Sequence, residues 1–422
     1  LMRIVFVLHQ FYPEFSGGTE RVVLNLARCA QRAGHYVHVL ACTMRDPAPA
    51  GKSSGALAGA HHEVYQGVPV TLIPRSLLPA SGDLGFDVAP AMVEQVRDWM
   101  RAERFELVHV FHTLRMASAL LAAQQCGLPY VVTLTDFFVG CYRINAINAQ
   151  GQPCSGPDEG RSCVRDCLVP EWTEPALLQR HQLAKALLQG AIERVAPSEY
   201  VAEFFRASFP ELPLRVIPHG IDFLALMGNG QSVVHAHEDL EPEAPITLGY
   251  VGAIVAQKGL HILLQALQRV PSERLRLRVV GGFYGDPVHQ QDIRNMMAAD
   301  SRVEWVGQVP PGDVAAVIKQ VDLLCLPSVV PESFSLVLHE AAVLGVPALV
   351  SDLGAPPAKI KAHGGGRVVA AGDVNAWAQA LTEILEVPDT LPSWRTGMRL
   401  PYRVEEEAFF YESLYRQAVV PH

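Results

Sequence analysis

The feature that most limits the fold of this chain is an alternation of short apolar runs with amphipathic helical segments, which occurs twice along the sequence. Runs that are apolar at every position are typical of strands buried on both faces of a parallel sheet. The amphipathic segments between them would cover the two faces of such a sheet. The sequence therefore predicts an α/β protein with two doubly wound, Rossmann-like domains.

The two series of elements set the expected domain boundaries. The first series predicts strands at residues 4–8, 37–41, 107–110, 130–134 and 194–196. The second predicts strands at residues 247–251, 277–280, 303–305, 323–326, 348–351 and 367–369. A polar, acidic stretch rich in Gly and Pro, residues 227–245, predicts a linker or loop. We expect one domain over residues 1–220, a second over 221–400, and a C-terminal helix within residues 401–422.

The composition excludes several classes of protein. A chain of 422 residues that is 49% apolar is too long for one ordinary core and fits two domains. Its net charge of −9 argues against a nucleic acid as the partner. The longest apolar runs fall short of the ~18 residues of a membrane span, and the apolar core before His9 is too short for a signal peptide. We therefore expect a cytoplasmic protein whose eight cysteines are mostly thiols.

Two turns after predicted strands carry groups suited to a ligand, since ligands bind beyond the carboxyl ends of the strands in open sheets. Gly17 and Gly18 directly precede a helix, where glycine lets a ligand approach and the helix N-terminus favours an anion. An ordinary turn explains these glycines equally well. Lys258 lies where a strand gives way to a helix and would suit a phosphate, although alone it is more simply a surface lysine.

Two glutamates eight positions apart, Glu332 and Glu340, flank the start of another predicted helix. On a straight helix this spacing is ~12 Å, which is similar to the length of a nucleotide diphosphate sugar between its two ends. A diphosphate would suit the free N–H groups between them, and the carboxylates would suit sugar and ribose hydroxyls. From spacing alone, a helix-end charge at Glu332 and a surface residue at Glu340 is the simpler interpretation.

The stretch from Leu326 to Ile360, LPSVVPESFSLVLHEAAVLGVPALVSDLGAPPAKI, closely resembles the E-x7-E signature of retaining glycosyltransferases of family 4. Five further stretches resemble other family segments in the same order, at residues 11–40, 216–222, 249–260, 364–381 and 405–419. The resemblance implies the GT-B fold, with two facing Rossmann-like domains, a cleft between them, and a last helix that returns to the N-terminal domain. It also implies transfer of a glycosyl group from a nucleotide diphosphate sugar to an acceptor hydroxyl with retention, without a cofactor for catalysis.

The resemblance assigns roles by position. Glu332 would contact the donor sugar, Glu340 the ribose and Lys258 the diphosphate. His112 and Asp136 complete the candidate catalytic set, and for His112 an acceptor contact and a structural role are equally plausible. The remaining donor-binding positions are Gly17, Gly18, Gly252, Gly307, Gln308, Val309, Phe334, Ser335, Leu336 and Val337.

Three positions depart from the family pattern. Ala253 stands where the family usually has arginine, and Phe111 and Thr135 stand where it usually has histidine. A non-catalytic nucleotide-sugar-binding or assembly subunit is therefore an alternative to an active transferase. Another GT-B activity, such as an epimerase or a phosphorylase, would not explain the E-x7-E signature.

Half of the cysteines fall in a predicted insertion, residues 136–170, which is rich in Gly, Asn and Asp. They are Cys141, Cys154, Cys163 and Cys167, and a subset of family 4 carries a similar cysteine-bearing insertion. Four thiolates in a loop with little apolar content predict a structural zinc ion. An iron–sulfur cluster, free thiols and disulfides are the alternatives, and the spacing lacks a C-x2-C pair.

The expected acceptor is a glycan or a lipid-linked molecule in the synthesis of a bacterial surface polysaccharide or glycolipid. The predicted helix at residues 92–105 carries Trp99 and Met100 among several arginines. It could touch the inner face of the cell membrane, although core packing is the simpler interpretation.

Overall fold

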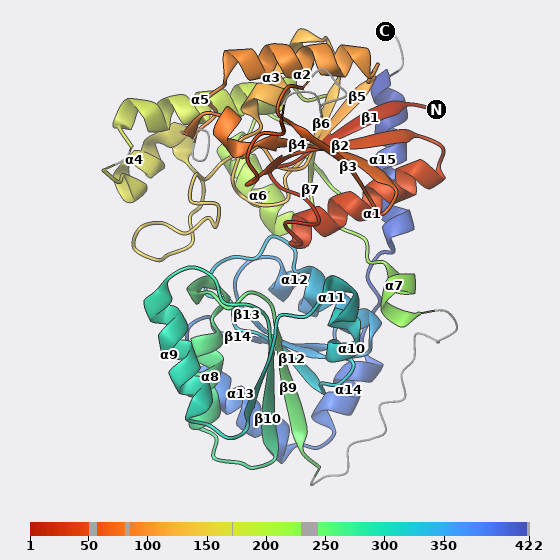
Figure 1. Cartoon of the computed structure of the whole chain (residues 1–422). Helices are drawn as coiled ribbons and strands as arrows, with labels where there is room; N and C mark the ends of the chain where they lie inside the picture. Colours follow the sequence, from red (N-terminus) through yellow and green to blue (C-terminus); the bar gives the residue numbers. More distant parts are fainter. Residues whose placement is uncertain (50–56, 81–84, 171, 229–243, 420–422) are drawn as a thin grey trace. The chain divides into compact units, whose positions relative to one another are not determined.

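The computed structural model describes residues 1–49, 57–80, 85–170, 172–228 and 244–419. Most of the predicted linker (residues 229–243) and the last three residues of the predicted C-terminal segment lie outside these ranges. The chain divides into two compact units (Figure 1): unit 1 is Leu1–Gly220 with Val404–His422, and unit 2 is Ile221–Arg403. Each unit contains one sheet with its helices, which confirms the predicted α/β class.

Unit 1 is built on an eight-stranded sheet in the order β3-β4-β2-β1-β5-β6-β7-β8. The strands are β1 (Arg3–Val7), β2 (Tyr36–Thr43), β3 (His61–Tyr65), β4 (Val68–Pro74), β5 (Leu107–Val110), β6 (Tyr130–Thr133), β7 (Glu193–Ala196) and β8 (Arg215–Val216). Neighbouring strands are parallel, except that β3 pairs antiparallel with β4. The five strands expected from the sequence form the contiguous centre of this sheet.

The three strands that the sequence did not predict lie at the two edges of the sheet. β3 has a polar sequence, HHEVY, with no fully buried side chain. β4 is apolar but contains Pro69 and Pro74, which interrupt a strand pattern. β8 has only two residues. The uniformly apolar pattern therefore identified only the strands in the middle of the sheet, where both faces are covered.

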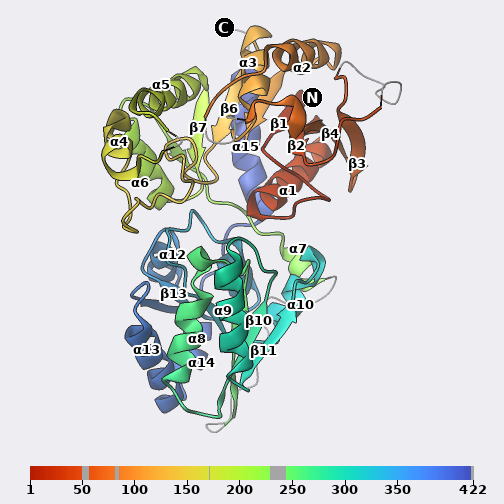
Figure 2. The ribbon, with the colours of Figure 1, turned by 60° about the vertical axis from the view of Figure 1, so that its left-hand side comes forward.

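Helices cover both faces of the unit 1 sheet (Figures 1 and 2). They are α1 (Gly18–Arg32), α2 (Pro90–Ala102), α3 (Ala117–Gln125), α4 (Arg161–Cys167), α5 (Glu174–Gly190), α6 (Glu199–Ser208) and α15 (Val404–Val419). Trp99 and Met100 of α2 lie in the apolar core, where they are 3% and 1% exposed. A membrane contact through these two side chains is therefore wrong, and core packing explains them. Within the described part of the chain, no helix has the length and apolar character needed to cross a membrane.

The last helix, α15, is fixed to unit 1 by a buried polar network. Tyr415 and Thr133 hydroxyls lie 2.5 Å and 2.7 Å from the two ring nitrogens of His109, and the Tyr411 hydroxyl lies 2.7 Å from that of Thr133. Burial holds the pKa of His109 well below its usual value, so the ring is neutral and one nitrogen donates while the other accepts. At the start of α15, Glu407 accepts hydrogen bonds from the Gly220 N–H at 2.8 Å and pairs with His219 at 2.9 Å.

Unit 2 is built on a six-stranded, fully parallel sheet in the order β11-β10-β9-β12-β13-β14. Its strands are β9 (Ile246–Val251), β10 (Leu275–Val280), β11 (Val303–Gly307), β12 (Leu323–Leu326), β13 (Ala348–Ser351) and β14 (Gly366–Val369), and all six were predicted. Because every strand runs the same way, their carboxyl ends and the loops that follow lie along one edge.

The helices of unit 2 form two layers. They are α7 (Phe223–Met227), α8 (Leu260–Gln268), α9 (Pro287–Ala298), α10 (Val314–Ile318), α11 (Leu336–Val343), α12 (Pro356–His363), α13 (Val374–Glu386) and α14 (Thr390–Thr396). One apolar core packs α8, α9 and α13 against the sheet, and a second packs α10, α11 and α12 against it (Figure 2). The predicted doubly wound arrangement is therefore present in this unit.

We predict that Tyr415→Phe destabilises unit 1, because it leaves one ring nitrogen of the buried His109 without its partner. The expected loss is about 1–3 kcal/mol in the free energy of unfolding, measured by urea denaturation followed by circular dichroism. The control, Phe409→Ala, changes a side chain of the same helix that is 73% exposed and should stay within about 0.5 kcal/mol of the parent chain. Equal losses in the two variants would contradict a stabilising role for the network.

Candidate active site

Lys258 is positioned by a close backbone approach between two strand ends of unit 2. It ends a 3-10 turn, Ala256–Lys258, that follows β9. Gly259 then adopts a left-handed conformation with a φ of 71°, and a Cβ atom on it would lie 1.9 Å from the Pro327 carbonyl oxygen. Only glycine fits this contact, so the turn rests on the end of β12. The Lys258 ammonium consequently lies 2.8 Å from Oε1 of Glu332.

Glu332 is held from a second side by the end of β13. Its carbonyl oxygen accepts a hydrogen bond from the Ala355 N–H at 2.8 Å, beside an isolated bridge between Glu332 and Gly354. Gly354 has a φ of 77°, and a Cβ atom on it would lie 2.3 Å from the Glu332 nitrogen. Any larger residue would displace Glu332, so the carboxylate position depends on this glycine.

The Glu332 side chain is 10% exposed and also accepts a hydrogen bond from the Ser328 hydroxyl. Burial by itself would raise the pKa of this carboxyl, but the Lys258 ammonium and the Ser328 hydroxyl outweigh burial and lower the pKa. Glu332 is therefore an ionised, largely buried hydrogen-bond acceptor beside a lysine that is 39% exposed. Such a pair can offer a carboxylate to hydroxyls and a cation to a phosphate.

The start of α11 has an unusual backbone. Ser335 is the N-cap residue and has a φ of 68°, which is uncommon for a residue with a side chain. His339 supports it, since its Nδ1 donates to the Ser335 carbonyl at 2.9 Å and its ring stacks on Phe334 with centroids 4.0 Å apart. The Ser335 side chain makes no capping bond to the first turn, which begins at Leu336 and Val337. Strained backbone of this kind is concentrated at functional sites.

The other predicted donor-binding residues of unit 2 lie along the same edge of the sheet. Gly252 follows β9, Gly307 ends β11, and Gln308 and Val309 come next. Glu340 lies inside α11 and is 4% exposed, so its interpretation as a surface residue is wrong. The structure therefore joins Lys258 and Glu332 by direct contact within unit 2, whereas Gly17, Gly18, His112 and Asp136 belong to unit 1.

The glycines at the start of α1 have a local structural explanation. Gly17 is the N-cap residue, and the Glu20 carboxyl folds back onto it, so that a Cβ atom on Gly17 would lie 2.6 Å from Glu20 Oε2. Glu20 is 1% exposed and accepts a hydrogen bond from Gln10 at 2.6 Å, and burial raises its pKa. A capping carboxyl therefore occupies the position in which the sequence predicted room for an anion.

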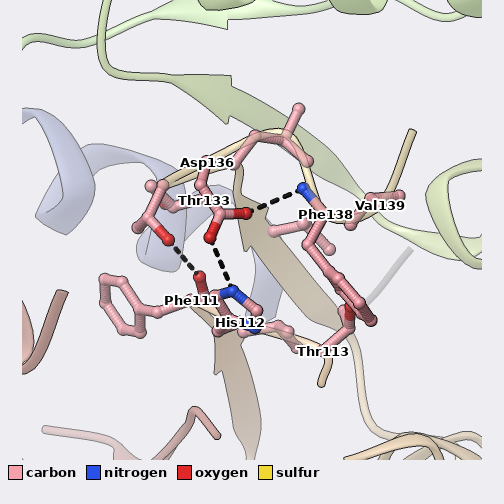
Figure 3. A pocket seen from close by; sticks show the side chains of 11 residues that line it. Phe111, His112, Thr113, Thr133, Asp136, Phe138 and Val139 are labelled. Carbon is pink, nitrogen blue, oxygen red and sulfur yellow. Dashed lines mark hydrogen bonds and ion pairs between the residues drawn. The ribbon is translucent and has the colours of Figure 1, made fainter. Parts of the chain in front are cut away.

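His112 and Asp136 follow β5 and β6, two adjacent strands of unit 1, and point toward each other in Figure 3. His112 Nε2 donates to Asp136 Oδ2 at 2.7 Å, and His112 Nδ1 accepts from the Leu114 N–H at 3.2 Å. Asp136 Oδ1 accepts from the Phe138 N–H at 2.8 Å. Both ring nitrogens of His112 are thus occupied, and its side chain is 4% exposed whereas that of Asp136 is 28% exposed. Asp136 is the member of this pair that can reach a ligand.

Sequence reasoning missed His9, which directly follows β1. Its ring lies against that of His112, with centroids 3.9 Å apart. Burial, followed by the charges of His112, Arg115 and Arg75, holds the pKa of His9 well below its usual value, so His9 is neutral at neutral pH. A polar residue at the carboxyl end of the first strand was the signal that would have found it.

Two of the three departures from the family pattern are part of the packing around His112. The Thr135 hydroxyl donates to the Phe111 carbonyl at 2.8 Å, and the Phe111 ring packs on Phe6 and His109. Ala253 lies after β9, and its carbonyl accepts a hydrogen bond from the Tyr250 hydroxyl at 2.7 Å. Phe111 and Thr135 therefore make structural contacts through their side chains, whereas the contact of Ala253 is made by its backbone.

The four clustered cysteines line one pocket of unit 1, together with residues such as Tyr142, Arg143 and Ile147. All eight cysteines of the chain are free thiols in the structure. Burial raises the pKa of Cys141, Cys163 and Cys167, that of Cys163 to about 12. The sulfurs do not meet at one point: no three His, Cys, Asp or Glu side chains among the described residues could hold a metal ion as they stand.

Comparison with solved structures identifies the fold as GT-B. Sucrose-phosphate synthase from Thermosynechococcus elongatus superposes with a TM-score of 0.70 at 21% identity, covering 99% of each chain. HepE from Anabaena, crystallised with UDP and glucose, superposes with a TM-score of 0.67 at 17% identity, covering 99% of this chain and all of that one. The chain therefore has the GT-B fold.

Comparison with known sequences identifies the family. Residues 16–223 match the family model described as Glycosyltransferase Family 4, and residues 245–387 match that of the Glycosyl transferases group 1. A D-inositol 3-phosphate glycosyltransferase from Mycobacterium marinum is 30% identical over 341 residues, which cover 78% of this chain and 68% of that protein. The chain belongs to glycosyltransferase family 4.

Two further relatives define the range of similarity. The D-inositol 3-phosphate glycosyltransferase of Nocardia farcinica is 28% identical over 250 residues, which are 56% of this chain and 54% of that protein. The chain likewise spans about half the length of other relatives of that name. A phosphatidyl-myo-inositol mannosyltransferase of Mycobacterium leprae is 24% identical over 374 residues, 87% of this chain and 84% of that protein.

We predict that Lys258→Met reverses the pH dependence that Glu332 contributes to the stability of the folded protein. In the parent chain the folded-state pKa of Glu332 lies below its usual value of 4.5, so its stabilisation is complete above pH 4.5 and is lost as the pH falls below it. Without the cation, burial should raise this pKa above the usual value, and stability should then fall as the pH rises through the range near 4.5.

The measurement is the urea midpoint of parent and variant between about pH 4 and 8, a range that spans ordinary and raised glutamate pKa values. The control is Lys361→Met, which removes an exposed lysine of α12 and should leave the parent profile unchanged. Parallel profiles for Lys258→Met and the parent would show that Lys258 does not set the ionisation of Glu332.

Proposed function

We propose that this protein transfers a glycosyl group from a nucleotide diphosphate sugar to an acceptor hydroxyl with retention at the anomeric carbon. The observation that carries the proposal is the Lys258–Glu332 pair, an ionised carboxylate 2.8 Å from a partly exposed ammonium at the start of α11. These groups match a ligand that has sugar hydroxyls beside a diphosphate. Family 4 membership supports the same reaction class.

In this proposal unit 2 binds the donor. Glu332 accepts hydrogen bonds from sugar hydroxyls, Glu340 serves the ribose, and Lys258 with the first N–H groups of α11 stabilises the diphosphate. The charge of the leaving diphosphate grows as the glycosyl bond breaks, so a fixed cation and helix N–H groups lower the barrier most at that point. The tight backbone around Gly259 and Gly354 supplies the positioning that this requires.

The reaction itself needs no side-chain base. The bond from the anomeric carbon to the diphosphate oxygen breaks, the acceptor oxygen bonds to the same carbon on the same face, and the acceptor proton passes to the departing oxygen. This agrees with His112, whose ring nitrogens are both engaged within the protein. Asp136 is left to accept a hydrogen bond from the acceptor, and His112 is a positioning residue for it.

We propose a polyol-bearing acceptor, either a glycolipid headgroup or a glycan, in the synthesis of a surface polysaccharide or glycolipid. The names of the relatives support this class, since they are glycosyltransferases of inositol phosphate and of phosphatidylinositol. A UDP-sugar is the first donor to test, because HepE was crystallised with UDP and glucose. A peripheral position at the inner face of a membrane would suit a lipid-linked acceptor.

The second candidate is a subunit that binds a nucleotide sugar without transferring it. Ala253 favours it, because the family's usual arginine would supply a second cation for the diphosphate. The two candidates predict the same donor binding and differ in turnover. Release of free nucleotide that depends on an added acceptor would support the transferase, and donor binding without release would support the subunit.

We predict that Glu332→Gln loses discrimination between the bound nucleotide sugar and its free nucleotide, while its affinity for the free nucleotide stays within about threefold of the parent. Removing the charge weakens hydrogen bonds to sugar hydroxyls by about 1–2 kcal/mol each, equivalent to roughly 5–30-fold in affinity. Isothermal titration with both ligands measures the two affinities.

The matched control is Glu340→Gln, the other carboxylate of the motif. It should lower the affinity for nucleotide sugar and free nucleotide together, because both ligands contain the ribose. If Glu332→Gln also lowered both affinities equally, the assignment of Glu332 to the sugar would be wrong. Retention is tested separately by NMR of the product, whose new linkage should have the anomeric configuration of the donor.

A further inference from the structure

The cysteine-bearing segment of unit 1 has little apolar core of its own. Its packing cluster contains the buried residues Tyr142, Cys167 and Leu177, with Cys163, Val164 and Trp172 partly buried against them. Elsewhere the segment is turns and short helices, including α4, and it lies beside α5 and α6 in Figures 1 and 2. The first part of the segment, from Phe137 to Ala146, contributes side chains to the main core of unit 1, so it is the part around α4 that depends on this small cluster.

The four cysteines come from separate parts of this segment and line one pocket. Cys141 follows the strand-end turn at residues 136–140, Cys154 lies in a loop, and Cys163 and Cys167 lie one turn apart in α4. Three cysteines of the chain's other four are buried in strands or helices, and none of those four lines this pocket. Four convergent thiols without a disulfide are the ligand set of a structural zinc ion.

The backbone of the loop hydrogen-bonds to one of the four sulfurs, that of Cys154. The Gly156 N–H donates to Cys154 Sγ at 3.4 Å. Donors aimed at a sulfur favour the thiolate over the thiol, and metal-bound thiolates are commonly held by such bonds.

A buried cation lies next to the same cysteines. Arg180 of α5 is 5% exposed and donates to the carbonyls of Phe138 and Val139, with its guanidinium 4.9 Å from the Phe138 ring centroid. Its charge interacts with Cys141 and Cys163. Four thiolates around a divalent cation would carry a net charge of −2, which a buried guanidinium beside them would offset.

We propose that Cys141, Cys154, Cys163 and Cys167 bind one zinc ion as four thiolates, with Arg180 as the buried countercharge. Because the four thiols line the pocket without meeting at one point, binding would turn their side chains inward and release their protons to solvent. The ion would tie the part around α4, which has only a small apolar cluster, to Cys141 at the edge of the main core. This inference concerns the stability of unit 1 and does not depend on the proposed glycosyl transfer.

The proposed zinc site is connected to Asp136, the candidate acceptor-binding residue, by a short series of hydrogen bonds. Arg180 holds the carbonyls of Phe138 and Val139, and the Phe138 N–H donates to Asp136, which pairs with His112. Order imposed on Cys141 by the ion therefore extends along one short segment to Asp136. Loss of the ion should loosen Asp136 and leave the donor groups of unit 2 unaffected.

The test is the metal content of the full chain purified from cells supplied with zinc. The parent protein and the control Cys126→Ser should each carry about one zinc per chain, since Cys126 lies at the end of α3 and outside the pocket. Cys154→Ser and Cys163→Ser should lose the ion. Replacement of zinc by cobalt(II) should give the visible and near-ultraviolet bands of tetrahedral thiolate coordination.

Folding of the variants is controlled with the parent protein itself. Chelation of its metal should lower the melting temperature, and added zinc should restore it, whereas nucleotide-sugar binding should survive the loss of zinc. Substoichiometric metal in the parent protein together with no cobalt bands would overturn the proposal. A brown protein with iron and labile sulfide, or a thiol titration that finds disulfides among the four cysteines, would overturn it in favour of the named alternative.

Discussion

The contact between the backbones of Glu332 and Gly354 is the constraint on which the candidate donor site depends. The end of β13 approaches so closely that a Cβ atom on Gly354 would lie 2.3 Å from the Glu332 nitrogen. On the other side, Gly259 brings the Lys258 turn onto the end of β12. The two approaches fix a carboxylate and an ammonium beside each other, where a buried carboxylate alone would be costly. Because the strands of unit 2 are parallel, their carboxyl ends lie along one edge of the sheet. The glycines allow the loops at that edge to approach one another closely.

In unit 1, the polar side chains at the ends of buried strands form their hydrogen bonds with other groups of the protein. His109 is bonded to α15 through Tyr415 and to β6 through Thr133, and His112 is bonded on both nitrogens. These histidines hold the strand ends in place, and in the proposed transfer the partly exposed Asp136 is the polar group for the acceptor. The replacements Phe111 and Thr135 belong to this packing, so they do not by themselves indicate a lost activity.

The central strands of both sheets could be predicted because strands covered on both faces must be apolar at every position. The outer strands β3, β4 and β8 could not, because partial exposure in β3, proline in β4 and the short length of β8 each remove that pattern. Clustering of Glu332 with Lys258 depends on strand order, which the family resemblance supplied and the residue pattern alone did not. The roles of Gly17 and His112 were not visible in the sequence, because the bonds of Glu20 and Leu114 that determine them are set by local backbone geometry.

The most direct test of the account is a thermal-shift comparison of UDP-, GDP-, ADP-, dTDP- and CMP-sugars, each paired with its free nucleotide. A ligand that binds only the folded state at about 100 times its Kd stabilises the fold by about 2.7 kcal/mol, which a melting curve resolves. The account predicts that one nucleotide sugar raises the melting temperature more than its own nucleotide and more than the other sugars. No shift with any of them at saturating concentrations would contradict a donor site built on Lys258 and Glu332.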